Sequence, residues 1–124
     1  MMLHHMEIQD RGDHSFVTTN STTLVELVPD IAVLKNYRFV EHVRFVNVAA
    51  ADVTASLYIR ETGPTDHLIG VMEVVAGGSG KMVVPVERIR LKNGESLMLK
   101  LGGVPSAQSE VYSEWRDAPE APSV

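Results

Sequence analysis

Between Thr22 and Trp115 the chain repeats one pattern, in which short runs of alternating apolar and polar residues are separated by Pro, Gly, Asn and Asp. The clearest run spans residues 53–60, where Val, Ala, Leu and Ile alternate with Thr, Ser, Tyr and Arg. Successive side chains of a β-strand point to opposite faces of a sheet, so this alternation predicts strands with one buried face. The pattern therefore predicts a small all-β domain.

Expected strands cover most of this region. They span residues 22–28, 37–48, 53–60, 67–75, 81–91, 96–101 and 109–116. Turn residues separate them, including Gly63-Pro64, a glycine-rich loop at residues 77–80 and Asn93-Gly94, which is a strong hairpin signal. Seven to eight short antiparallel strands with regular turns predict a β-sandwich, either Ig-like or jelly-roll.

Two residues break the alternation inside expected strands. Glu41 falls on the apolar side of its strand, which predicts a β-bulge or a strand end. Pro85 cannot donate to a sheet ladder, so it predicts an edge strand or a break. The apolar face expected for the strand around Glu41 carries Tyr37, Phe39, Val43 and Phe45.

The chain is expected to form one domain with an extension at each end. Its 124 residues fit a single domain, and a 44% share of hydrophobic residues is enough to build a core. Residues 1–20 are polar with little periodicity and are predicted to form an N-terminal arm. Residues 21–117 form the predicted sandwich, and residues 118–124, which contain two prolines, form a C-terminal tail.

Composition excludes several classes of function. A formal net charge of -5 and a pI of about 5.4 argue against a nucleic-acid partner or an anionic membrane, because both need a basic surface. The absence of cysteine excludes a disulfide scaffold, a thiolate zinc site and a cysteine nucleophile. Neither a signal peptide nor a bilayer-spanning apolar run is recognisable, so we expect no membrane partner and assembly in a cytoplasm.

No motif in the chain predicts catalysis, a cofactor or a metal site. The glycine-rich loop ends in Gly-Lys, but Val75 and Met82 stand where a phosphate-binding loop needs Gly and Ser or Thr. His42 and His67, the histidines outside the arm, lack the partners that a catalytic triad would need. In the arm we expect a solvated polar segment rather than a metal centre, although it gathers His4, His5, Glu7, Asp10, Asp13 and His14.

Tyr58 and Trp115 are the candidate contacts with a partner or a glycan. Aromatic rings are large, rigid contact surfaces, and Tyr58 falls on the polar face of an otherwise regular strand. Trp115 fits either a surface or the core. If both rings were exposed and coplanar, they would form a platform for a sugar ring, which is why a carbohydrate-binding β-sandwich module is the alternative function.

Three segments resemble small β-sandwich structural proteins of tailed bacteriophages, which occur as head decoration, neck or tail accessory subunits. They are residues 43–60 (VRFVNVAAADVTASLYIR), residues 89–97 (IRLKNGESL) and Leu27-Val28-Pro29. The resemblance covers about residues 22–115 and carries no catalytic residues with it. It implies a non-enzymatic virion protein that acts by protein–protein assembly.

The same resemblance implies partners and a place of action. The partners would be other capsid or tail subunits, and further copies of the chain in a homo-oligomer, because virion subunits sit on symmetric particles. Exposed strand edges and the arm would make these contacts. The chain would be assembled in the host cytoplasm and end in the virion.

Overall fold

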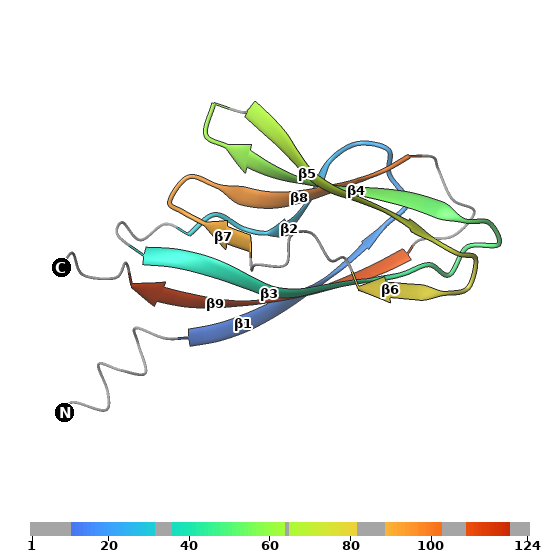
Figure 1. Ribbon diagram of the computed structural model, residues 1–124, viewed down its shortest axis with the longest axis horizontal. Coiled ribbons are helices and arrows are strands. Elements are labelled where there is room, and N and C mark those ends of the chain that lie inside the picture. Colours follow the sequence, from blue (N-terminus) through green and yellow to red (C-terminus); the bar gives the residue numbers. More distant parts are fainter. Residues whose placement is uncertain (1–10, 32–35, 64, 82–88, 103–108, 120–124) are drawn as a thin grey trace.

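The computed structural model describes residues 11–31, 36–63, 65–81, 89–102 and 109–119. Within these ranges the chain forms nine β-strands and no helix (Figure 1). The strands are β1 (Arg11–Thr19), β2 (Val25–Val28), β3 (Asn36–Val46), β4 (Val53–Glu61), β5 (Thr65–Val74), β6 (Ser79–Lys81), β7 (Ile89–Leu91), β8 (Ser96–Leu101) and β9 (Ser109–Pro119).

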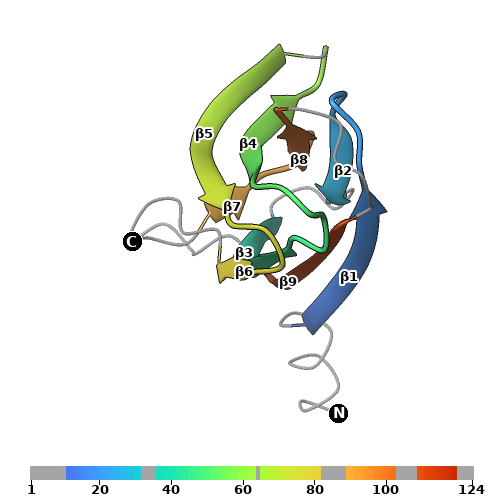
Figure 2. The same ribbon diagram turned by 90° about the vertical axis from the view of Figure 1, so that its right-hand side faces the viewer.

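The strands form two antiparallel sheets that lie one above the other (Figure 2). Sheet A has the order β1-β9-β3-β6, and β7 also pairs with β3; sheet B has the order β2-β8-β4-β5. Because β6 pairs with residues 44–46 of β3 and β7 with residues 38–40, these two short strands share one edge position. The expected β-sandwich is confirmed. Its strand order, in which most successive strands change sheet, is that of a jelly roll rather than an Ig-like sandwich.

One expected hairpin has the predicted turn but not the predicted pairing. Asn93 and Gly94 form a tight turn, in which the Glu95 N–H donates to the Lys92 carbonyl over 3.0 Å and Gly94 has a φ of 90°. The turn joins β7 in sheet A to β8 in sheet B, so no hairpin forms. Among the described turns, the one at Gly63 joins two strands of one sheet, the β4–β5 hairpin.

Strand β1 corrects the expected N-terminal boundary. Residues 11–20 were expected in an arm, but β1 pairs with β9 along its whole length, from Arg11 opposite Asp117 to Thr19 opposite Ser109. At the other end, β9 continues to Pro119, past the expected boundary at residue 117. The remaining parts of the predicted arm and tail, and Pro85, lie outside the described residues.

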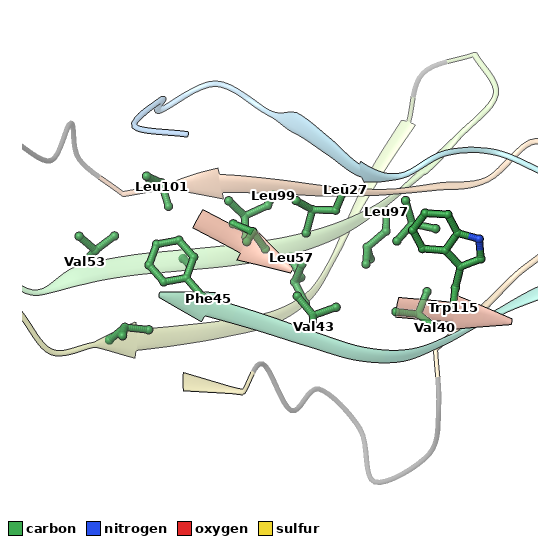
Figure 3. Close-up of a cluster of buried hydrophobic side chains, with 14 of the residues drawn as sticks. Leu27, Val40, Val43, Phe45, Val53, Leu57, Leu97, Leu99, Leu101 and Trp115 are labelled. Atoms are coloured by element: carbon green, nitrogen blue, oxygen red, sulfur yellow. The ribbon is translucent and has the colours of Figure 1, made fainter. Parts of the chain in front are cut away.

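The hydrophobic core fills the space between the two sheets (Figure 3). The expected inward faces of β4 and β8 are confirmed, because Leu97, Leu99 and Leu101 are at most 1% exposed, Val53, Ala55 and Leu57 are buried, and Ile59 packs against the core while partly buried. Each buried leucine or phenylalanine contributes about 1.5–3 kcal/mol through removal of apolar surface from water. The labelled members of the core are Leu27, Val40, Val43, Phe45, Val53, Leu57, Leu97, Leu99, Leu101 and Trp115.

A β-bulge at Glu41 divides β3 into two halves. The alternation of inward and outward side chains is reversed between these halves. The pairing register of β3 against β9 shifts between Val40 and His42, so the predicted bulge is confirmed. An extra residue reverses the alternation that follows it. The expected face is therefore wrong for Tyr37 and Phe39, which lie on the outer side of sheet A while the second half of β3 keeps its apolar residues inward.

Candidate interaction surfaces

The titratable side chains of the described ranges form pairs and ring contacts rather than clusters of metal ligands. No group of three or more His, Asp or Glu side chains there could hold a metal ion. The ring of His42 contacts that of Tyr112, and His67 Nε2 lies 3.1 Å from a Glu61 carboxylate oxygen. The same ranges contain no helix long and apolar enough to cross a membrane.

Trp115 is part of the core and not of the surface. It lies on the inner side of β9 and only 5% of it is exposed. The guanidinium carbon of Arg38 lies 5.2 Å from the Trp115 ring centroid, and Arg38 also donates two hydrogen bonds, of 2.7 and 2.9 Å, to the Asp117 carboxylate. This arrangement ties β3 to β9 at the end of the sandwich.

Tyr58 lies on the outer face of sheet B, as the sequence predicts. It stands opposite Leu68 of β5 and Met98 of β8, and its ring is half-buried. The Lys100 ammonium nitrogen is 5.5 Å from the ring centroid. Tyr58 and Trp115 therefore belong to different sheets and face different environments, so the structure does not bring the two candidate residues together.

Strand β5 carries an exposed row of aliphatic side chains beside Tyr58. Leu68 and Val71 point outward from sheet B and are 57% and 60% exposed, and Val75, directly after the strand, is 61% exposed. We call these three residues the β5 surface. They are three of the five large hydrophobic residues that stand out as exposed in the described part of the chain, and such a concentration is typical of an interaction site.

Strand β5 is also the outermost strand of sheet B, at the opposite edge from β2 (Figure 2). It spans 10 residues and β1, an edge strand of sheet A, spans nine, whereas β2 has four and β6 and β7 have three each. Natural proteins commonly protect long edges with Lys or Pro, which hinder pairing with another chain. The β5 sequence, TDHLIGVMEV, contains neither residue, and no strand of the described ranges pairs with its outer edge, although its pairing with β4 shifts register between Leu57 and Tyr58.

A second concentration of large side chains lies on the outer face of sheet A. Four rings from three neighbouring strands form one connected group: His14 and Phe16 of β1, His42 of β3 and Tyr112 of β9. Tyr112 is central, with ring centroids 5.1 Å from Phe16, 5.9 Å from His42 and 6.0 Å from His14. We call these four residues the ring cluster. Phe16 is 61% exposed.

Charged side chains surround and interleave with these rings. The Tyr112 hydroxyl donates a 2.6 Å hydrogen bond to the Glu114 carboxylate, which raises the pKa of Tyr112 above its ordinary value of 10.0. Arg116 Nε lies 3.2 Å from Glu41 Oε1, and the Arg116 guanidinium lies over the ring of Phe39. Polar and aromatic groups thus alternate across this face.

A hollow adjoins the ring cluster at the start of β1. Gly12, which has no side chain, stands opposite Arg116 in the sheet and leaves this space open. His14, a member of the ring cluster, also lines the hollow, and so does Glu114, which accepts the hydrogen bond of Tyr112. The residues that line the hollow are Gly12, Asp13, His14, Glu41, Glu114, Trp115 and Arg116.

Sequence reasoning missed this face. Four of the seven Phe, Tyr and Trp residues of the chain lie on it, namely Phe16, Tyr37, Phe39 and Tyr112. Phe16 fell in the expected arm, and Tyr37 and Phe39 were assigned to the apolar face because the bulge reverses the alternation. The alternation of Val111, Ser113 and Trp115 with Tyr112, Glu114 and Arg116 was the signal that could have placed Tyr112 outward.

No protein-family model matches the chain, and a search of curated proteins finds no match. Solved structures do share its architecture. A chain from the capsid structure of the Helicobacter pylori bacteriophage KHP30 is 9% identical, with 90% of each chain covered and a TM-score of 0.56. A chain from Bacillus endospore appendages, described as disulfide-linked pili, is 14% identical, with 91% of this chain and 90% of that chain covered and a TM-score of 0.53.

A third solved structure, PirA, is 8% identical, with 82% of this chain and 92% of that chain covered and a TM-score of 0.51. At such low identities these likenesses show a common fold, the two-sheet β-sandwich.

Proposed function

We propose that the chain is a non-enzymatic virion protein of a bacteriophage, a capsid decoration or a neck or tail accessory subunit that acts by protein–protein assembly. The observation that carries this proposal is strand β5, a 10-residue edge without Lys or Pro beside the exposed side chains of Leu68, Val71 and Val75. An open edge is a template for a strand of another chain.

Two further observations support an assembly role. The sequence resembles small β-sandwich structural proteins of tailed phages at residues 43–60 and 89–97. Two of the solved structures with the same fold come from a phage capsid and from pili, and both are assemblies of many subunits.

The proposed contact extends sheet B from one subunit to the next. Backbone N–H and C=O groups on the outer edge of β5 would pair with an edge strand of a neighbouring subunit, either another copy or another capsid or tail protein. The side chains of Leu68 and Val71 would be buried against that neighbour, and Tyr58 would contact it from the adjacent strand. In this way the β5 surface supplies affinity, and the backbone ladder supplies register.

A lysine introduced on β5 tests the proposal. The chain would be expressed together with the proteins encoded by its flanking genes, and the assembled particles would be separated by sedimentation and analysed by mass spectrometry. We expect Val71→Lys to lower incorporation by about tenfold or more, because a charge on an edge strand hinders pairing. Val48→Lys is the matched control, since Val48 is 55% exposed but lies outside any strand.

Each outcome bears on the proposal. If the Val71→Lys protein is incorporated as well as the wild-type protein, β5 is not the contact between subunits. Absence of the wild-type chain from the particles, with flanking genes that encode no portal, capsid or tail protein, would remove the virion role itself.

A further inference from the structure

We propose that the outer face of sheet A binds an oligosaccharide at the ring cluster and the adjoining hollow. The proposal is independent of the assembly role, because it uses the other sheet and different side chains. It rests on three features of that face: exposed aromatic rings, neighbouring hydrogen-bond donors and acceptors, and an open space beside the rings.

The rings provide a stacking surface. Pyranose sugars present patches of C–H groups that pack on aromatic faces, while their hydroxyls stay hydrated or hydrogen-bonded. Phe16 is 61% exposed and its ring is tilted by 41° from that of Tyr112, at a centroid distance of 5.1 Å. Because β1, β9 and β3 are hydrogen-bonded neighbours, these rings are held in place before any ligand arrives.

The hollow provides partners for hydroxyl groups. A sugar hydroxyl both donates and accepts hydrogen bonds, so its site needs acceptors and donors at close quarters. Glu41 and Glu114 supply carboxylate acceptors, and Arg116 supplies guanidinium donors, on the walls of one hollow. Their existing contacts, such as the 3.2 Å pair between Arg116 and Glu41, already orient these groups.

The same chemistry argues against a protein partner at this face. The centre of a protein–protein interface is depleted of charged residues. Here the carboxylates of Glu41 and Glu114, a residue type depleted at such centres, lie beside the rings. The aliphatic β5 surface has the composition suited to a protein neighbour, so the two sheets offer two different kinds of contact.

Gly12 gives a variant that blocks the hollow without disturbing the strand. A Cβ added at this residue would meet nothing closer than the Trp115 carbonyl oxygen, at an ordinary contact distance of 3.8 Å. Valine is favoured in strands, so Gly12→Val is expected to fold and to fill the space that the sugar would occupy. Phe16→Ala removes the exposed ring instead.

The test uses the full chain and a panel of defined glucose, galactose, mannose and N-acetylglucosamine oligosaccharides. Binding would be detected on an array and measured by calorimetry. We expect one class to bind the wild-type protein, and Phe16→Ala and Gly12→Val to weaken its affinity by about tenfold or more. Tyr58→Ala, which removes a ring from sheet B, and Val71→Lys should both bind as the wild type does. Thermal unfolding would confirm that all four variants fold.

The proposal is overturned if no oligosaccharide of the panel binds at concentrations of about 10 mM. It is also overturned if Tyr58→Ala weakens binding as much as Phe16→Ala, since the sugar would then lie on sheet B. If Phe16→Ala instead abolishes incorporation into particles while no sugar binds, the face is a protein interface. Loss of incorporation in Val71→Lys with unchanged sugar binding would keep the two proposals separate.

Discussion

At the scale of single residues, Asn47 organises the connection that follows β3. It is fully buried, and its side-chain amide donates to the carbonyls of Ala51, Val74 and Val75 at 3.0–3.2 Å. Its side-chain oxygen accepts the Ala49 N–H at 2.9 Å. One side chain thus fixes the β3–β4 connection against the end of β5, next to the β5 surface.

Asn47→Ala should destabilise the fold by about 2–4 kcal/mol, because buried carbonyl and N–H groups would lose their partners. Urea unfolding followed by circular dichroism would measure the change. The neighbouring exposed residue provides the control, since Val48→Ala is expected to change stability by less than about 0.5 kcal/mol. Equal stabilities for the two variants would contradict this role of Asn47.

The Tyr112–Glu114 hydrogen bond has a consequence for titration. Its carboxylate acceptor raises the pKa of Tyr112 above 10.0, so the protonated phenol is favoured in the folded state. The contribution of this bond to stability is complete below pH 10 and is lost as the pH rises through the folded-state pKa. Glu114→Gln should therefore move the ultraviolet titration of Tyr112 to lower pH. An unchanged titration would exclude the carboxylate as the cause.

At the scale of elements, the strands that the sequence predicts best are those with uninterrupted alternation and one fully apolar face. Strands β4 and β8 meet this condition, and both have the expected inward side chains. β1 does not, because its inward side includes Ser15 and its outward side carries Phe16. A polar residue inward and an aromatic residue outward oppose the usual rule, so the alternation in this segment does not predict a strand.

The candidate surfaces were harder to predict than the strands, since they depend on which elements become neighbours. Tyr58 was placed outward correctly because its own strand fixes its direction. The sequence does not predict whether Trp115 lies in the core or on the surface, because its burial depends on the second sheet that covers it. The ring cluster joins three strands whose pairing crosses almost the whole chain, and no local pattern encodes that pairing.

The bulge in β3 yields a prediction at this scale. Deleting Glu41 would restore continuous alternation, and one half of β3 would then have to face the wrong way. Either Tyr37 and Phe39 would enter the core or Phe45 would leave it. We expect a loss of cooperative thermal unfolding, whereas Glu41→Ala, which removes a part-buried ion pair, should cost about 0–1 kcal/mol. Similar stabilities for the deletion and the substitution would show that the bulge is dispensable.

At the scale of the whole molecule, the two candidate surfaces belong to opposite layers of the sandwich. Sheets A and B form the two layers (Figure 2); the β5 surface lies on sheet B, and the ring cluster lies on the outer face of sheet A. A subunit held by β5 would therefore keep the ring cluster accessible. The two proposed contacts are compatible in one particle, which would present the sheet A face outside the contact between subunits.

The position of β9 between β1 and β3 also has a consequence for how the protein is made. Ribosomes deliver the chain from the N-terminus, and β9 is the last of the described strands to emerge. Until it does, sheet A lacks the strand that pairs with both β1 and β3. Apart from the β4–β5 hairpin, few strands that are neighbours in a sheet are close in sequence. A nascent chain that stops before residue 109 would display its apolar faces to chaperones and proteases. Cells would therefore clear truncated copies of the chain.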